Sequence, residues 1–549
     1  MKKTNIIHIV IDAVRYYNSQ RDERDKLHLF DQLKEDPTFY SFEKMVVSAP
    51  SSVMSAITML TGVYSYPLAK NYNDFKFDFK SFPSLPEILK KENYKIYSLF
   101  NAREMREKMN SILPYCDSSI LPKGVKLSQY KWKNTDINNC VHNMIKKNYF
   151  EKDPFYLMLW YNSRFDTNTS ITVENMLNTF KKKKFYKDTI IIVTADHGYP
   201  DQRRGLTSDG PDLKKVGLSH DCILTDDNIC VPFSIKFPDN NLLTIDKKTR
   251  ETLYKTVISQ ETIYPTILSL LQKKAPESHY FLPKGKSLET LISNPQSSFW
   301  KNYLFRSDAR FIFQPNRISS LRNQNFKYIY HHETNEETLY NLKEDPKENH
   351  NIASSNQIQT KELHALFLEQ EKNTLNTWSC LIKKQLDQFF INTPQVKWYN
   401  LNETLHLIFL GKSLFVYPIW DYFCKNNKKS IVYATYLKQK LKTQYPSMVI
   451  KDISEFQQSI NTIILIDDLQ DKLQLQLLKK HKIKQALIID CNINFYKSLS
   501  KVFRQAKTNA FLSPFKSMAI RRELYYKEPL TLLKDLYRLI TRLLSGFIK

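Results

Sequence analysis

The stretch that decides the fold covers residues 190–198 and reads IIIVTADHG. A nearly continuous apolar run of this length, closed by a glycine, is typical of a buried strand. In an open α/β sheet, ligands bind just beyond the carboxyl ends of the strands. Asp196 and His197 leave the predicted strand there and offer one oxygen and one nitrogen ligand, a set that suits a divalent metal ion. A strand end followed by an ordinary capped turn is the alternative interpretation of so short a motif.

Around this stretch, apolar strands alternate with helical patterns. The other predicted strands in this part of the chain are Asn5–Ile11, Tyr94–Phe100 and Phe155–Tyr161. The predicted helices are a segment that begins near Pro50 and runs to Leu60, then Phe82–Lys91, Val173–Lys184 and Glu261–Leu271. Such alternation predicts an α/β fold with a mostly parallel sheet flanked by helices.

Smaller elements follow between residues 230 and 390. Cys230–Lys236 has the pattern of an edge strand, because Pro232 stands near its start. Ile318–Tyr330 predicts two short antiparallel strands, Glu337–Asn351 a polar turn-rich segment, and Lys361–Phe390 a helix. We therefore expect a first domain over residues 1–375, with a small C-terminal subdomain at about 300–350, and a linker over 376–400.

The pattern then restarts and predicts a second, smaller α/β domain over residues 401–528. Its predicted strands are Leu405–Phe409, Ile431–Ala434, Met448–Ile450, Thr462–Ile466 and Ala486–Ile489, separated in places by helical stretches such as Leu469–Lys480. Nothing in the pattern assigns this domain a role. Residues 529–549 predict a basic amphipathic helix, which either makes a peripheral contact with an anionic membrane or packs on the second domain.

The composition indicates which classes of partner and which cellular compartment to expect. A chain of 549 residues is too long for a single hydrophobic core, so at least two domains are expected. The net charge of +25 favours anionic partners. No nucleic-acid-binding motif accompanies that charge, so nucleic acid is not an expected partner. The seven scattered cysteines suit a reducing compartment. No signal peptide or membrane-spanning run is recognised, so we expect a cytoplasmic location, with association at the inner face of the membrane as a further expectation.

Three separate segments carry groups that suit one catalytic site. Asp12 follows the first predicted strand, Ser52 stands at a predicted helix start, and Asp196 and His197 follow a later strand. A helix N-terminus presents free N–H groups to an anion. A divalent ion held by the two carboxylates and the imidazole would lower the pKa of the Ser52 hydroxyl and neutralise an oxyanion.

These segments resemble the signature blocks of the sulfatases and their relatives in the alkaline phosphatase superfamily. The blocks are IVIDAVR at 9–15, SVMSAITMLTG at 52–62 and TADHG at 194–198, in matching order and spacing. Downstream, GLSH at 217–220 with NICVPF at 228–233 resembles a further block, and SLR at 320–322, KY at 327–328, LYNL at 339–342 and DP at 345–346 resemble the C-terminal subdomain. The resemblance covers about residues 1–375 and implies the fold of that superfamily.

The resemblance also implies roles for individual residues. Asp12, Asp196 and His197 would be the metal ligands, and Ser52 would be the nucleophile and also touch the metal. His220 would contact the oxyanion or the leaving group of the substrate.

Two arginines are further candidates for binding the substrate. Arg164 stands where the family has a histidine and would bind a phosphate or sulfate bidentately, with a surface arginine as the alternative. For Arg15 the alternative is a surface position or packing behind the site. The divalent metal is zinc, magnesium, manganese or calcium, since a mixed oxygen and nitrogen set tolerates each of them.

The chain departs from the family pattern at informative positions. Ala13 replaces a second aspartate, while Met54 and Ala56 replace the proline and arginine that formylglycine-forming enzymes need. Ser52 is therefore expected to be an unmodified hydroxyl, and Ser51 is the nucleophile if the register is off by one. A sulfated serine resists turnover, whereas a phosphorylated serine is open to attack by water or an acceptor alcohol.

We therefore expect a metal-dependent hydrolase or transferase that acts on phosphate or sulfate esters through a covalent serine intermediate. An anionic substrate such as a glycan or a lipid-linked intermediate in bacterial surface-glycan modification would fit. The alternatives are a true sulfuric ester hydrolase and a catalytically degenerate binding or scaffold protein of the same fold.

The unmodified state of Ser52 is directly testable. Mass spectrometry of the peptide that contains Ser52 should find an unmodified or phosphorylated serine, because the residues required for conversion are absent. A peptide mass that corresponds to formylglycine would contradict this prediction.

Overall fold

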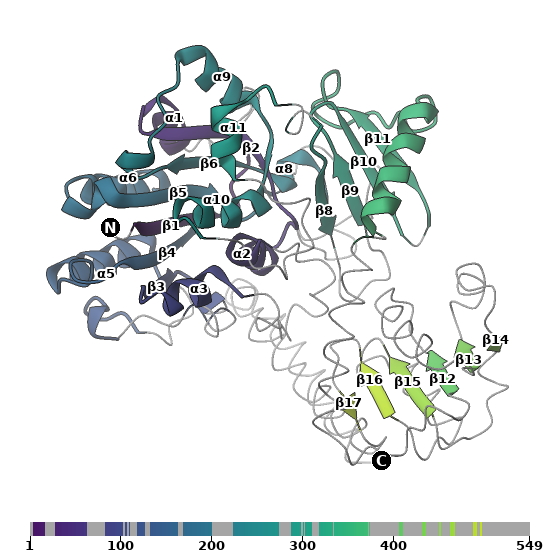
Figure 1. Cartoon of the computed structure of the whole chain (residues 1–549), viewed down its shortest axis with the longest axis horizontal. Coiled ribbons are helices and arrows are strands. Elements are labelled where there is room, and N and C mark those ends of the chain that lie inside the picture. Colours follow the sequence, from purple (N-terminus) through teal and green to yellow (C-terminus); the bar gives the residue numbers. More distant parts are fainter. Residues whose placement is uncertain are drawn as a thin grey trace, which may run out of the picture. The chain divides into compact units, whose positions relative to one another are not determined.

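The computed structural model describes residues 4–16, 28–62, 83–102, 105, 106, 109, 113, 118–126, 132–162, 168–199, 223–273, 287–297, 300, 302–309, 318–332, 334–371 and 373, together with six strands further on. The chain divides into two units, Met1–Asn373 and Thr374–Lys549. In the part of the chain that the structure describes, the first unit contains two sheets and the second unit contains one (Figure 1).

The main sheet of the first unit has seven strands in the order β3-β4-β1-β5-β6-β2-β7. They are β1 Asn5–Asp12, β2 Phe39–Val46, β3 Lys95–Phe100, β4 Phe155–Asn162, β5 Thr189–Ala195, β6 Cys230–Lys236 and β7 Ile258–Ser259. β1 lies between β4 and β5 and is parallel to both. Since these three strands are buried on both faces, they consist of nearly continuous apolar runs. The predicted α/β fold with a mostly parallel sheet is confirmed.

The prediction that Cys230–Lys236 is an edge strand is wrong. β6 lies inside the sheet and pairs antiparallel with both β5 and β2. Pro232 is tolerated there because the pairing with β2 shifts register between Phe42 and Met45, so that Pro232 stands opposite this irregularity. On the other side the pairing of β6 with β5 ends at Thr194 and Phe233, so Pro232 lies just beyond it.

Helices cover the main sheet. They are α1 His28–Glu35, α2 Ser52–Thr61, α3 Leu85–Lys91, α5 Asn134–Lys146, α6 Thr169–Lys181, α8 Asp226–Ile229, α9 Lys247–Lys255, α10 Ile263–Leu270 and α11 Leu288–Ser293. Helix α3 starts later than the predicted Phe82, because Ser84 caps it and forms a capping box with Glu87. Helices α1, α5 and α6 pack in one group, and α2, α3, α10 and α11 pack in another.

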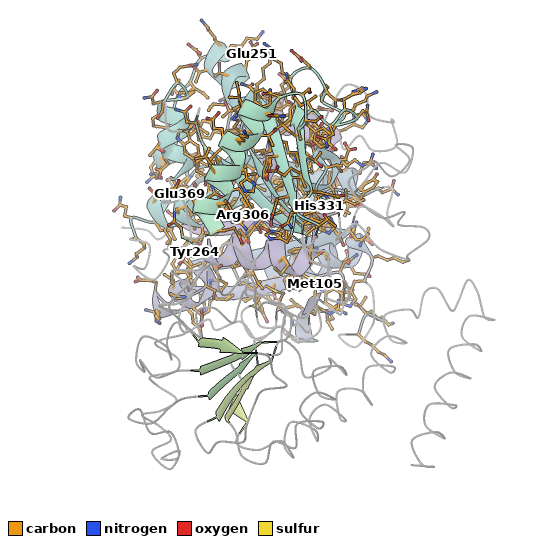
Figure 2. All side chains as sticks on the ribbon, turned by 90° about the vertical axis from the view of Figure 1, so that its right-hand side faces the viewer. Met105, Glu251, Tyr264, Arg306, His331 and Glu369 are labelled. Atoms are coloured by element: carbon orange, nitrogen blue, oxygen red, sulfur yellow. The ribbon has the colours of Figure 1, made fainter. Side chains whose placement is uncertain are left out.

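A second sheet in the first unit has four antiparallel strands in the order β11-β10-β9-β8. They are β8 Phe305–Ala309, β9 Ile318–Arg322, β10 Phe326–His331 and β11 Glu337–Asn341. The segment expected to be polar and turn-rich, Glu337–Asn351, begins with a strand, β11, because Leu339 packs with Tyr328 and with Phe367 of the helix over 357–371. Figure 2 faces this end of the unit, with Arg306 and His331 labelled on the sheet and Glu369 on that helix.

In the second unit the structure describes six strands in the order β14-β13-β12-β15-β16-β17. They are β12 His406–Phe409, β13 Ile431–Ala434, β14 Val449–Lys451, β15 Thr462–Ile466, β16 Leu487–Asp490 and β17 Phe495–Tyr496. The first five are mutually parallel, and β17 is antiparallel to β16. The predicted helices Leu469–Lys480 and 529–549 lie outside the described residues. Among the helices that the structure describes, none has the length and apolarity required to cross a membrane.

One buried carboxyl of the first unit has an unusual pKa. Glu261 lies in the short 3-10 turn Gln260–Thr262 before α10, and its side chain accepts a hydrogen bond from Ser259. Burial raises the pKa of Glu261 to about 7, although the Ser259 hydrogen bond and the charge of Arg306 both act to lower it. The folded state therefore binds a proton at Glu261 more tightly than the unfolded chain does.

This shift predicts a pH-dependent stability. The protonated Glu261 stabilises the fold at low pH, and that stability is lost as the pH rises through about 7. Between pH 5 and 8 the free energy of unfolding should fall by about 2.5 kcal/mol more in the wild type than in Glu261→Gln. Denaturant unfolding at both pH values measures this difference. Glu251→Gln, at an exposed position of α9, is the control and should behave as the wild type. Parallel pH profiles of wild type and Glu261→Gln would contradict the prediction.

Candidate metal centre

The candidate site lies where the central strands of the main sheet end. Asp12 is the last residue of β1, and Asp196 and His197 directly follow β5. β1 and β5 are adjacent and parallel, so their carboxyl ends meet at the same edge of the sheet. Ser52 is the first residue of α2. Segments nearly 200 residues apart in the sequence are thus brought to one place.

The donor atoms of this site are close together. One ligand atom each from Asp12, Asp196 and His197 lies within 4.8 Å of the others. His197 Nε2 is 3.3 Å from Asp196 Oδ2 and 4.0 Å from Asp12 Oδ1. Ser52 Oγ lies 3.2 Å from the same nitrogen. The structure therefore brings together four of the residues expected to form the site, while their roles remain predictions.

The two carboxylate oxygens of Asp196 have different surroundings. Its Oδ1 accepts hydrogen bonds from the backbone N–H groups of Ala13 at 2.9 Å and His197 at 2.8 Å. Its Oδ2 is fully buried and accepts no hydrogen bond from any described residue. A buried carboxylate oxygen without such a partner is costly. A cation placed between Asp196, Asp12 and His197 would remove that cost, so the donor set fits a metal ion.

The ring of His197 is held in one tautomer. Its Nδ1 lies 2.6 Å from the carbonyl oxygen of Gly198. Because a carbonyl can only accept, Nδ1 carries a proton, and in the neutral ring the lone pair is then on Nε2. Histidines that bind metals in proteins are commonly oriented through such a bond from the other ring nitrogen. Nε2 thus faces the two carboxylates and the Ser52 hydroxyl, and its one lone pair is available to a metal ion there.

Ala13 has an unusual backbone conformation next to Asp12. Its φ of 60° lies in the left-handed region, which alanine seldom adopts. This turn directs the N–H of Ala13 to the carboxylate of Asp196. Such conformations persist where the surroundings determine them, often at functional sites. Ala13 therefore orients a neighbouring ligand through its backbone although it offers no ligand atom in its side chain.

Asn162 belongs to the site and was missed by the sequence analysis. It is the last residue of β4 and is paired in register with Asp12. Its Nδ2 donates to Asp12 Oδ2 at 3.2 Å. Asn134 holds Asn162 in turn, accepting its backbone N–H at 3.0 Å and donating to its carbonyl at 2.8 Å. The available signal was a polar residue that ends an apolar strand, as Asp12 does in β1.

Helix α2 presents Ser52 at its N-terminus. Every other residue of α2 is buried, and Ser52 is partly exposed. Ser51, the alternative nucleophile, is the N-cap residue, and its buried Oγ has no hydrogen-bond partner among the described residues. The contact with His197 is made by Ser52. Ala56, where formylglycine-forming enzymes need an arginine, is fully buried in the core.

The remaining candidates for substrate binding are placed differently. Arg15 is buried, donates from Nε to the carbonyl of Tyr199 at 2.8 Å and stacks on the Tyr199 ring at 3.8 Å from its centre. These contacts match the packing alternative for Arg15, since they brace the loop that follows His197. Arg164 and His220 lie outside the described residues.

Comparisons with known proteins place this geometry in context. Residues 217–373 match the family model described as "N-sulphoglucosamine sulphohydrolase, C-terminal". No curated protein matches the sequence. Several solved structures share the fold of the first unit.

Three of these structures are representative. One is a protein in complex with its substrate D-glucosamine-2-N,6-O-disulfate, with 14% identity, a TM-score of 0.52 and coverage of 68% of this chain and 98% of that one. A 2-O GAG sulfatase has 14% identity, a TM-score of 0.50 and coverage of 67% and 92%. The protein yidJ from Bacteroides fragilis, described as a sulfatase, has 15% identity, a TM-score of 0.50 and coverage of 67% and 96%. At these identities the likeness shows a shared fold.

The loop after His197 generates a prediction about metal binding. A Cβ at Gly198 would lie 1.9 Å from the carbonyl oxygen of Asp227, so in Gly198→Ala either Asp227 or the backbone of residue 198, whose carbonyl orients His197, must move. We expect the affinity of the metal-free protein for Mn²⁺ to fall at least about tenfold, measured by calorimetric titration.

Gly124→Ala is the matched control for this substitution. Gly124 also has a positive φ, of 85°, but nothing lies within 4 Å of a Cβ placed there. This variant should keep the affinity of the wild type. Unchanged Mn²⁺ affinity in Gly198→Ala would show that the loop does not position the ligand.

Proposed function

We propose, from the premise that the first unit has the sulfatase fold of the alkaline phosphatase superfamily, that the chain is a metal-dependent hydrolase or transferase of phosphate or sulfate esters. The observation that carries the proposal is the contact of Ser52 Oγ with His197 Nε2 at 3.2 Å, beside two carboxylates. A hydroxyl at a helix N-terminus, next to three ligand groups, is the arrangement that a nucleophilic serine needs.

In this proposal Asp12, Asp196 and His197 hold the metal, which is zinc, magnesium, manganese or calcium. When bound, the ion would lower the pKa of the Ser52 hydroxyl and neutralise charge on the ester oxygens. Asn162 keeps the carboxylate of Asp12 oriented through its hydrogen bond to Oδ2. Asp196 stays in place because two backbone N–H groups hold its other oxygen.

The reaction proceeds in two displacements. Ser52 gives its proton to a solvent water molecule, and its Oγ forms a bond to the phosphorus or sulfur as the bond to the leaving alcohol breaks. The alcohol oxygen takes up a proton, for which His220 is the proposed donor. The N-terminus of α2 directs N–H groups at the transferred oxygens. Water or an acceptor alcohol then attacks the same phosphorus or sulfur and gives up a proton, while the bond to Ser52 Oγ breaks and that oxygen regains a proton; water as the attacking group gives hydrolysis, and an alcohol gives transfer.

A serine–histidine–aspartate triad would be a different explanation for the same side chains. In a triad, the histidine accepts the serine proton at one ring nitrogen, and the aspartate accepts from the other. Here Asp196 Oδ2 lies 3.3 Å from Nε2, the nitrogen that faces Ser52. Nδ1 donates to the Gly198 carbonyl instead. The arrangement around His197 therefore favours a metal ligand over a general base.

We infer that phosphate esters are preferred to sulfate esters. The chain lacks the proline and arginine after Ser52 that conversion to formylglycine requires. An unmodified serine has no elimination route for releasing sulfate. The sulfated glycan bound by one structural neighbour, the 2-O GAG activity of another and the charge of +25 support an anionic glycan or lipid-linked substrate. A role in bacterial surface-glycan modification, at the inner face of the membrane through residues 529–549, is part of this proposal.

Substitution of Ser52 separates catalysis from metal binding. Ser52→Ala should lose at least about 10³-fold in hydrolysis of an aryl phosphate, because the nucleophile is gone. It should still bind metal, because Asp12, Asp196 and His197 are unchanged. A chelator should abolish the wild-type activity, and re-added metal should restore it.

The matched control is Ser51→Ala, which removes the neighbouring hydroxyl and should retain activity. Equal activity in Ser52→Ala and the wild type would overturn the proposed nucleophile. Faster hydrolysis of the aryl sulfate than of the phosphate would favour the true sulfuric ester hydrolase. A wild-type protein that binds no metal and cleaves neither ester would favour the scaffold protein.

A further inference from the structure

The loop that orients His197 is itself held by α8. The N–H of Gly198 donates to the carbonyl of Asn228 at 2.8 Å, and the N–H of Tyr199 donates to the carbonyl of Asp227 at 3.1 Å. The carbonyl of Gly198 in turn accepts from Nδ1 of His197. Any displacement of α8 is therefore transmitted through two backbone hydrogen bonds to the ring of a metal ligand.

Helix α8 has only four residues, so its own hydrogen bonds cannot fix its position. Its first residue, Asp226, is anchored instead by the four-stranded sheet. Asp226 Oδ2 lies 2.7 Å from Nη1 of Arg322 in β9, and Oδ1 lies 3.1 Å from Nζ of Lys327 in β10. Glu348 accepts the backbone N–H of Asp226 at 2.9 Å and pairs with Lys327 at 2.6 Å.

The charges of this cluster are almost entirely removed from water. Arg322, Lys327, Asp226 and Glu348 are all buried. Burial alone would raise the pKa of Asp226, but the charges of Arg322 and Lys327 hold it well below its usual range. Buried ion pairs are often no more stabilising than apolar residues of the same size. Their geometric specificity is thus a better explanation for four charges around one short helix than stability alone.

We propose that Lys327 and Arg322 are positioning residues of the metal centre, which act on His197 through Asp226, α8 and the backbone of Gly198. The four-stranded sheet then has a catalytic purpose, since it fixes the direction of Nε2 without contacting substrate or metal. This inference rests on the proposed function, because it takes His197 to be a metal ligand.

β10 offers a matched control in adjacent residues. Lys327 faces Asp226 and Glu348, while Tyr328 points to the other face of the sheet, where its hydroxyl contacts Glu337 and His364. Tyr328→Phe removes buried polar contacts from the same strand without touching α8. A purely structural role of β10 would make the two positions equivalent in their effect on the site.

The experiment compares wild type, Lys327→Met and Tyr328→Phe as metal-free, full-length protein. Calorimetric titration with Mn²⁺ should give about a tenfold weaker affinity for Lys327→Met and no change for Tyr328→Phe. Hydrogen exchange, followed by mass spectrometry of a peptide ending at residue 199, should show loss of protection at Gly198 and Tyr199 in Lys327→Met alone. The exchange measurement needs neither metal nor activity.

Each result decides one question. Unchanged affinity and exchange in a folded Lys327→Met variant, or equal losses in both variants, would overturn the positioning role. If Lys327→Met does not fold, Glu348→Gln removes the other half of the buried pair and carries the same expectation. A wild type that binds no Mn²⁺ would overturn the metal centre of the proposed function, and the exchange data alone would then decide whether β10 controls the loop.

Discussion

The hydrogen bond from Nδ1 of His197 to the carbonyl of Gly198 is the constraint on which the site depends. It fixes the tautomer, and so it makes Nε2 an acceptor that faces Ser52 and two carboxylates. Without it, the ring could present a proton to the place where a cation would bind. The buried Oδ2 of Asp196 also favours a cation at this position, because it has no hydrogen-bond donor among the described residues.

Much of the fold follows from local sequence patterns. β1, β4 and β5 are recognisable because both of their faces are buried, which leaves long apolar runs that end in polar residues. The placement of Asp12 and Asp196 at one edge then follows from the parallel topology. The position of β6 could not be predicted from its own sequence, because its pairing with β5 and β2 depends on tertiary contacts. Pro232 by itself suggests an edge strand.

The site was predictable only in part, for physical reasons. Side chains such as Asp12 and His197 stand in short motifs, and their proximity follows from the sheet. Asn162 acts through one hydrogen bond and depends on the register of β4 with β1, which no local pattern encodes. The ion cluster around Asp226 joins residues about 100 positions apart, and each of them alone has the sequence context of an ordinary surface charge.

The proline in β6 has a consequence for how the chain reaches this fold. β6 must insert between two strands that precede it in the sequence, one of them by almost 190 residues. Sliding β6 by one residue would exchange its two faces and set the missing N–H of Pro232 against a regular rung of the ladder. A register shifted by one residue is therefore disfavoured for two reasons, and Pro232 favours the pairing seen here, in which the edge that carries Asp196 and His197 is aligned.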